Sequence, residues 1–317
     1  MIDSTTPRTT RGPVAPGYRL FDVQVARTER IGRSLVRLTL GGEQLRAFGA
    51  GGDDQRIKLV LGRGDQPVPD FPPGQDWSAA WRAMPNDVRP HLRTYTVRAT
   101  RRDCAELDID VVLHGLDDGS AGPAASWAAT ARSGDPAVIV GPDRPGHGRA
   151  WGCEWAPPPD ARSLLLAGDE TSVPAIGAIL ERLPSGTQAI ACVEVAHPED
   201  LQRWQVSPGV DVRWSFREPR SHERGSLLVP AVLEAMTELC GGRPQQIIDD
   251  VVDPDVDNAI PWDVPGGGHP LGDAYAWLAG EAGVIKKLRR LLVTGAGLHR
   301  SSVAFMGYWR EGSAEAD

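Results

Sequence analysis

The sequence lacks any apolar run long enough to cross a membrane. Its longest runs, such as Leu164–Ala167 and Ala189–Val193, have the length of a strand, whereas a helix that spans a bilayer needs about 20 apolar residues. The stretch from Met1 to Arg19 mixes Ser, Thr, Pro and Arg and has no apolar segment typical of a signal peptide. We therefore expect a cytoplasmic protein without membrane insertion.

Cysteine is scarce, and no two cysteines form a Cys-x-x-Cys pair. The four cysteines are Cys104, Cys153, Cys192 and Cys240. This spacing argues against zinc and iron–sulfur sites, so we expect no bound metal. Cys192 lies within an apolar run and is predicted to be a small core residue.

Positive charge is in deficit, with 34 Lys and Arg against 42 Asp and Glu and a formal net charge of −8. Such a chain repels polyanions, so we expect no nucleic-acid partner. Five aspartates gather in a loop predicted over residues 244–273, but without the glycine and glutamate positions of an EF-hand. They are Asp249, Asp250, Asp253, Asp255 and Asp257, and we interpret them as a solvated acidic loop.

The length of 317 residues favours two domains. Residues 18–142 contain short β-rich runs separated by polar loops, the pattern of an antiparallel β-barrel. One run alternates apolar Leu107, Ile109, Val111 and Leu113 with polar residues. The predicted strands include Leu35–Leu40, Ile57–Leu61, Thr94–Ala99 and Leu107–Leu113.

Residues 143–162 are rich in Pro and Gly, and we predict a linker there. Over residues 163–312 strands alternate with helices, which indicates a parallel sheet of an α/β domain. The predicted strands are Ser163–Ala167, Gln188–Val195, Val210–Phe216, Ala274–Ala279 and Ser302–Met306. The predicted helices are Val173–Leu183, a short one near Pro198–Trp204, Leu227–Leu239 and Gly283–Val293.

The motif Arg93-Thr94-Tyr95-Thr96 lies on a predicted barrel strand. An Arg can bind a phosphate in a forked geometry, and a Tyr two residues later on the same face can stack on an aromatic ring. A neighbouring Thr can hydrogen-bond the ring's polar edge. Together these groups meet the needs of a flavin nucleotide, although the same residues also occur in ordinary strands.

A second motif joins His114-Gly115 to Gly122-Pro123-Ala124-Ala125-Ser126-Trp127-Ala128. Small residues at the start of a helix leave backbone N–H groups free and let a phosphate approach. We therefore predict a pyrophosphate site here. The alternatives are that Ser126 is an N-cap residue and that His114 is a surface histidine.

A third motif, residues 164–176, combines a strand, a tight turn and a helix start. Open α/β sheets bind ligands at such points, although the glycine fingerprint of dinucleotide-binding proteins is missing. Asp169 and Glu170 would repel a phosphate placed directly on them. We expect them to cap the helix or to line a nicotinamide pocket.

With these motifs, the chain resembles the siderophore-interacting protein family, the FAD-dependent ferric-siderophore reductases of the ferredoxin-reductase-like superfamily. The resemblance also rests on Ala279-Gly280-Glu281 and on the closing residues 307–312. All the motifs lie in the family's order and cover residues 18–312. The resemblance implies an FAD-binding β-barrel followed by an NAD(P)H-binding α/β domain whose C-terminal segment returns to the flavin.

The resemblance also implies roles for single residues, with electron transfer through FAD and no catalytic side chain. Arg93, Tyr95 and Thr96 would hold the FMN half of FAD. His114 would lie near the adenylate or pyrophosphate. Thr171, Tyr308 and Trp309 would approach the isoalloxazine. The full cofactor set expected is Arg93, Thr94, Tyr95, Thr96, Asp110, Val112, His114, Gly122, Ala124, Ala125, Ser126, Trp127, Thr171, Tyr308 and Trp309.

The implied reaction passes electrons from NADPH or NADH through FAD to a ferric siderophore and releases Fe(II). Arg217 and Arg220 would favour NADPH by binding its 2′-phosphate. The full donor set expected is Asp169, Glu170, Ser215, Arg217, Arg220, Gly280 and Glu281. The alternatives are a flavin oxidoreductase that works with ferredoxin or another small acceptor, and a binding protein that has lost FAD.

Ferric siderophores are often anionic, and one predicted helix carries four bases around an apolar stripe. The stripe consists of Ile285, Leu288 and Leu292. The bases, predicted as a substrate patch, are Lys286, Lys287, Arg289 and Arg290. The alternative is an ordinary solvated helix face with bases near its C-terminus.

Overall fold

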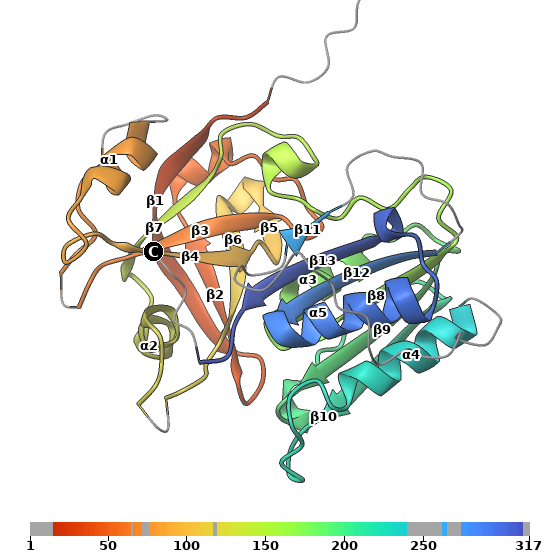
Figure 1. Ribbon diagram of the computed structural model, residues 1–317. Helices are drawn as coiled ribbons and strands as arrows, with labels where there is room; N and C mark the ends of the chain where they lie inside the picture. Colours follow the sequence, from red (N-terminus) through yellow and green to blue (C-terminus); the bar gives the residue numbers. More distant parts are fainter. Residues whose placement is uncertain are drawn as a thin grey trace, which may run out of the picture.

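Two β-sheets, one in each half of the chain, form the framework of the computed structural model (Figure 1). The structure describes residues 15–64, 66–71, 76–116, 119–239, 262–264 and 274–312. The acidic loop predicted from residue 244 and Cys240 therefore lie outside the described residues, apart from residues 262–264. Within the described ranges no helix has the length and apolar character needed to cross a membrane.

The first sheet is antiparallel and curls into a barrel-like shape, as predicted. Its strand order is β4-β3-β7-β1-β2-β6-β5. The strands are β1 (Tyr18–Arg30), β2 (Leu35–Gly41), β3 (Arg56–Leu61), β4 (His91–Thr96), β5 (Ala99–Arg101), β6 (Glu106–Val112) and β7 (Pro136–Pro142). Helices α1 (Trp77–Ala83) and α2 (Pro123–Thr130) lie in its connections.

The predicted strand Thr94–Ala99 is wrong, because the chain changes partners within it. β4 ends at Thr96 beside β3, and β5 begins at Ala99 beside β6. Between them Val97 N–H donates to Gln55 O at 2.7 Å and Arg98 N–H donates to Asp108 O at 2.8 Å. β4 and β5 are the two edge strands of the curled sheet. One continuous segment of the chain thus forms both edges.

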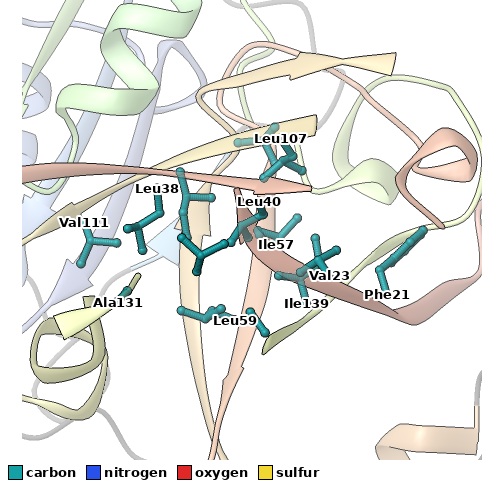
Figure 2. Packing of buried hydrophobic residues seen from close by; sticks show 14 of the residues in the cluster. Phe21, Val23, Leu38, Leu40, Ile57, Leu59, Leu107, Val111, Ala131 and Ile139 are labelled. Carbon is teal, nitrogen blue, oxygen red and sulfur yellow. The ribbon is translucent and has the colours of Figure 1, made fainter. Parts of the chain in front are cut away.

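The inside of the curled sheet is filled by apolar side chains from alternate strand positions (Figure 2). In β6 the predicted alternation holds, since Leu107, Ile109 and Val111 are buried in this core. Asp108 and Asp110 lie on the opposite face and are also buried, because arginines from neighbouring strands cover them. Burial of the apolar face fixes the register of this strand.

The second sheet is parallel except for one short edge strand. Its order is β10-β9-β8-β12-β13-β11, and β11 runs antiparallel to β13. The strands are β8 (Ser163–Asp169), β9 (Gln188–Val195), β10 (Val210–Phe216), β11 (Trp262–Asp263), β12 (Ala274–Glu281) and β13 (Val303–Trp309). The bounds of β9 and β10 match the prediction.

Three helices cover the two faces of this sheet (Figure 1). They are α3 (Val173–Leu180), α4 (Leu228–Leu239) and α5 (Ala282–Arg290). The apolar residues of α3 share a core with Leu164 and Leu166 of β8, whereas α4 and α5 pack on Leu165 and Ala167. Strand residues thus alternate between two helical layers. Cys192 is buried in the α4–α5 core, as predicted.

Two of the predicted helices differ from the structure. The helix predicted near Pro198–Trp204 is a 3₁₀ turn over Pro198–Asp200. The helix predicted to end at Val293 leaves α-helical geometry after Arg290 and continues as one π-helical turn, Leu291–Gly295. Its apolar stripe of Ile285, Leu288 and Leu292 is fully buried, as predicted.

The segment predicted as a linker packs closely between the two sheets. Asp54, which precedes β3, is fully buried and its Oδ1 accepts hydrogen bonds from the N–H groups of Glu154 and Trp155 at 3.0 and 2.9 Å. Its Oδ2 accepts from Trp277 Nε1 in β12 at 3.2 Å. One carboxylate therefore joins the first sheet, the linker and the second sheet.

A second buried carboxylate joins the two halves elsewhere. Asp200, in the 3₁₀ turn after β9, accepts from the backbone N–H of Ser34 at 2.6 Å and from its hydroxyl at 2.9 Å. Ser34 lies in the turn between β1 and β2. Ion pairs Arg98–Glu181 (2.8 Å) and Arg182–Asp53 (3.0 Å) add further contacts between the halves.

We predict that Asp54→Ala lowers the free energy of unfolding by about 2–4 kcal/mol, because it leaves three N–H groups buried without an acceptor. Urea titration of the full chain measures the change. Asp211→Ala, which removes an exposed ion pair with Arg213, is the matched control and should cost less than about 1 kcal/mol. Equal losses in the two variants would contradict the role given to Asp54.

Asp54 also predicts a pH dependence. Burial raises the pKa of Asp54 to about 6, although its hydrogen bonds and Arg56 oppose the shift. Because the folded pKa exceeds the unfolded one, the contribution of Asp54 to stability is fully present below pH 4 and is lost as pH rises through 6. The loss is about 3 kcal/mol. In Asp54→Asn the free energy of unfolding should change less with pH over this window. If its slope against pH is the same as in the wild type, another group causes the pH dependence.

Candidate functional site

The carboxyl ends of three parallel strands meet at one side chain, Asp169 at the end of β8. Its Oδ1 accepts from the N–H and hydroxyl of Thr171 at 2.9 and 2.5 Å. Its Oδ2 accepts from the N–H of Glu281 at 2.8 Å and from Trp309 Nε1 at 2.9 Å. Burial, followed by the charge of Glu170, raises the pKa of Asp169. This carboxylate positions the groups around it.

Two glycines allow this close packing. A Cβ at Gly168 would lie 2.0 Å from the carbonyl oxygen of Ala279, and a Cβ at Gly280 would lie 2.8 Å from the Asp169 carboxylate. Gly280 also has φ of +151°, which few other residues adopt. The motifs around Gly168 and Gly280, far apart in the sequence, are thus brought into direct contact.

Next to Asp169, a buried ion-pair network joins β8, β9 and the loop after β10. Arg217 donates from Nη2 to Glu170 at 2.9 Å and from Nη1 to Glu194 at 3.2 Å. Arg224 donates to the same Glu170 at 2.7 Å. Burial alone would raise the pKa of Glu170, but the charges of Arg224 and Arg217 lower it overall.

Arg217, which we expected to bind a 2′-phosphate, is buried in this network and donates to two carboxylates. Its contact with the donor stays a prediction. Arg220 is exposed, so its predicted contact with the donor stays a prediction. Ser215, near the end of β10, is half-buried and also remains untested. Glu170 forms ion pairs and does not cap α3, whose N-cap position is Ser172.

Trp309 and Tyr308, at the end of β13, have different surroundings. Arg224 lies over the ring of Trp309 at 4.6 Å. Tyr308 stacks on Trp262 at 6.0 Å and meets Trp277 edge-on at 6.4 Å. Among the residues that the structure describes, the buried Tyr308 hydroxyl has no hydrogen-bond partner, and burial raises its pKa. A buried hydroxyl without a partner indicates a place where a ligand atom or water can bind.

A narrow gap, too small to hold a water molecule, lies at the carboxyl ends of β8, β9 and β12, beside the N-termini of α4 and α5. Predicted donor residues Asp169, Gly280 and Glu281 are in its lining. The remaining lining residues are Glu194, Arg224, Gly225, Leu228, Val284 and Ile285. The lining therefore contains three carboxylates, those of Asp169, Glu194 and Glu281, and one guanidinium, that of Arg224.

On the first sheet, the flavin motif and the helical motif both border the first core. Tyr95 of β4, Trp127 of α2 and Leu113 after β6 are partly buried and pack on the same core. In the strand register, Arg93 pairs with Leu59 and Tyr95 pairs with Ile57. Arg93 and Tyr95 therefore lie on the same face of the sheet as these partners. Thr94 and Thr96 lie on the other face, where Thr94 interacts with Lys58.

The start of α2 is built from small residues. Gly122 is its N-cap residue and has no side chain that could cap the helix, and a Cβ at Gly122 would meet nothing within 4 Å among the described residues. Ala124 and Ala125 occupy the first turn, so small residues border the helix end. Ser126 lies inside the helix, which excludes the N-cap alternative. His114 is exposed after β6, compatible with either interpretation.

Several predicted residues lie away from these groups. Asp110 is bound by Arg37 through two hydrogen bonds of 2.7 and 2.8 Å, and Val112 packs toward the core of the second half. Their cofactor roles remain predictions. The bases Lys286, Lys287, Arg289 and Arg290 follow the first turn of α5 and do not line the gap. Arg289 lies over Phe305 at 4.5 Å.

Three important residues were missed in the sequence: Asp54, Glu194 and Arg224. Glu194 is a charged residue within an apolar strand and is almost fully buried. A charge in such a strand is a signal that could have found it, because buried carboxylates are almost always paired. Asp54 and Arg224 lie in loops and carry no comparable signal.

Two family descriptions match the chain. Residues 24–146 match the siderophore-interacting FAD-binding domain, and residues 161–312 match the siderophore-interacting protein domain. The chain belongs to the siderophore-interacting protein family. The resemblance drawn from the motifs is therefore confirmed.

Among curated relatives, the uncharacterized protein Rv2895c of Mycobacterium tuberculosis is 32% identical over 302 residues, covering 94% of this chain and 93% of the relative. Ferric vibriobactin reductase ViuB of Vibrio cholerae is 27% identical over 297 residues, covering 94% and 91%. An NADPH-dependent ferric-chelate reductase of Escherichia coli is 27% identical over 274 residues, covering 86% of each chain.

Solved structures agree with this assignment. A siderophore utilization protein from T. fusca superposes with a TM-score of 0.67 at 25% identity, covering 95% of this chain and 96% of that one. The ferredoxin reductase of carbazole 1,9a-dioxygenase shares the fold, with a TM-score of 0.57 at 13% identity over 92% of this chain and 70% of its own. The predicted ferredoxin-reductase-like fold is confirmed.

The residues present fit FAD, the cofactor that this family implies. The start of α2 has a glycine as its N-cap residue, and the space beside Gly122 among the described residues would let a phosphate approach the helix N-terminus. Tyr95 and Trp127 offer partly buried aromatic rings at the first core, and the buried hydroxyl of Tyr308 has no hydrogen-bond partner among the described residues. Each observation comes from a different part of the chain.

We predict that Gly122→Asp raises the dissociation constant for FAD at least about tenfold while leaving thermal stability equal or higher. Aspartate is a favoured N-cap residue at the φ and ψ of Gly122, but its charge repels a phosphate. Fluorescence titration with FAD and thermal unfolding measure the two effects. Gly122→Asn, which caps without charge, is the control; equal affinity in the two variants would place the pyrophosphate elsewhere.

Proposed function

We propose that this protein is an FAD-dependent reductase that passes electrons from NAD(P)H to a ferric siderophore. The observation that carries the proposal is the glycine start of α2 at the first sheet, together with the strand ends gathered around Asp169 in the second sheet. The first arrangement suits a flavin nucleotide, and the second suits an electron donor.

Flavin supplies the link between a two-electron hydride donor and ferric iron, which accepts one electron. In the proposal, the start of α2 and Arg93 hold the phosphates, and Tyr95 supports the ring system. Thr96 and Thr171 lie on the two halves of the chain and would bind polar atoms of the ring. Tyr308 and Trp309 would close the site from the second half.

The Asp169 carboxylate keeps this second half in place. It holds the Thr171 hydroxyl and the Trp309 indole in fixed positions through hydrogen bonds of 2.5 and 2.9 Å. Because its acceptor positions are filled, Asp169 is a positioning residue in this proposal. Electron transfer needs proximity and orientation rather than an acid or base, and this geometry supplies both.

The proposed acceptor follows from the relatives. ViuB is named a ferric vibriobactin reductase, and the Escherichia coli relative a ferric-chelate reductase that depends on NADPH. Reduced iron binds hard oxygen donors less tightly, so reduction releases it. The bases of α5 would attract an anionic chelate at longer range, and ferredoxin is the alternative electron donor.

We expect the purified protein to show flavin absorption that bleaches with anaerobic NADPH and recovers on addition of a ferric siderophore. The bleaching reports electron entry, and the recovery reports electron transfer to iron. Formation of Fe(II) is followed independently with a ferrous chelator. An equal concentration of the same siderophore loaded with gallium, which is not reduced, is the control.

The outcomes separate the parts of the proposal. Bleaching without recovery would contradict the siderophore as acceptor. If the flavin bleaches with reduced ferredoxin but not with NADPH or NADH, the electron donor is ferredoxin and not a nicotinamide. Absence of bound flavin even after incubation with FAD would overturn the reductase function.

A further inference from the structure

Tyr308, near the end of β13, lacks the anchor that a buried tyrosine usually has. A buried tyrosine hydroxyl usually finds a hydrogen-bond partner, but that of Tyr308 has none among the described residues. The torsion that turns a tyrosine ring has broad minima, so it fixes the ring plane only weakly. The orientation of Tyr308 therefore depends on the groups that pack against its ring.

Two tryptophans of the second sheet contact this ring. Trp262 of β11 stacks on it, with ring centroids 6.0 Å apart and planes inclined by 23°. Trp277 of β12 meets it edge-on, at 6.4 Å and 85°. Both are favourable geometries for aromatic pairs. Because one partner is nearly parallel to the Tyr308 ring and the other nearly perpendicular, together they restrict its plane and its position.

Both tryptophans are in turn bound by the first half of the chain. Asp54, just before β3, accepts a hydrogen bond from Trp277 Nε1 at 3.2 Å. Two residues later, the guanidinium of Arg56 lies over the ring of Trp262, 4.3 Å from its centroid. The place of Tyr308 relative to the first sheet therefore depends on two side chains at the start of β3.

Trp262 needs such contacts, because it lies on the short edge strand β11 and is 40% exposed. Arg56 is itself fixed by an ion pair with Glu154 at 2.7 Å. Arg149 pairs with the same carboxylate at 3.1 Å and donates to the carbonyl oxygen of Val264 at 2.5 Å. β11, which lies where the two halves meet (Figure 1), is thus attached to the first half and the linker at both Trp262 and Val264.

Resting on the proposed function, we propose that Trp262 is a positioning residue of the flavin site. Together with Arg56 it sets the orientation of the Tyr308 ring, through which the second half closes on FAD. The start of β3 thereby aligns a group of the second half with the cofactor held by the first. Loss of Trp262 then weakens FAD binding through Tyr308, without a direct contact between Trp262 and FAD.

Fluorescence titration of the flavin-free full chain with FAD tests this inference. We expect Trp262→Ala to raise the dissociation constant by about 2- to 10-fold, the range that corresponds to one lost aromatic pair. Trp262→Phe keeps a ring that can stack and should restore most of the affinity. Trp204→Ala removes a half-buried tryptophan that packs on Trp214 at 5.2 Å. It is the matched control and should bind FAD as the wild type does.

A double-mutant cycle shows whether Trp262 acts through Tyr308. The variant that carries both Trp262→Ala and Tyr308→Ala should bind FAD as weakly as Tyr308→Ala alone, because residues that act through one contact are not additive. Additive losses, or wild-type affinity in either single alanine variant, would overturn the inference and leave the proposed function intact. Absence of FAD binding by the wild type would overturn the proposed function, and the inference with it.

Each variant is first tested by thermal unfolding, so that a loss of affinity is not a loss of folded protein. If Trp262→Ala does not fold, Arg56→Lys takes its place in the titration. It keeps a charge beside Glu154 but loses the planar guanidinium over Trp262. It should raise the dissociation constant by about 2- to 5-fold, and wild-type affinity in this variant would overturn the proposal.

Discussion

A carboxylate taken out of water is stable only where N–H groups replace the water it has lost. Four such carboxylates fix the junctions of this chain: Asp54, Asp169, Glu194 and Asp200. Asp54 joins the two sheets through the linker, and Asp200 joins them at the turn after β1. Asp169 gathers three strand ends, and Glu194 fixes the start of α4. The site exists because these junctions are fixed.

The two halves of the candidate site differ at their helix N-termini. In the first half the residues leave space for a ligand there, and in the second half protein carboxylates occupy the N–H groups. At α2, a glycine N-cap and small residues leave space beside the helix N-terminus among the described residues. At α4 and α5, internal carboxylates use the donors that a ligand would otherwise take. Helix N-termini that look alike in the sequence therefore have opposite consequences for phosphate binding.

Local pattern predicted most of the elements, because burial of alternating or continuous apolar residues depends on near neighbours in the chain. Strand β9 and the apolar stripe of α5 are examples. The break at Val97 was not predictable in this way, since the partner strand changes there. The ion pairs of Arg217 were not predictable either, because its partners lie 47 and 23 residues away. Motifs thus suggested candidate residues, but long-range pairing decides which of their side chains are engaged within the protein.

The contacts of Asp54 and Asp200 also limit how the two halves can move. They fasten the second half to two different turns of the curled sheet. A body held at two separated points keeps one rotation, about the line that joins them, and every other motion of the halves breaks at least one of the contacts. Two buried carboxylates thus set the axis of any hinge motion that keeps both contacts, and such domain motions take roughly microseconds to milliseconds.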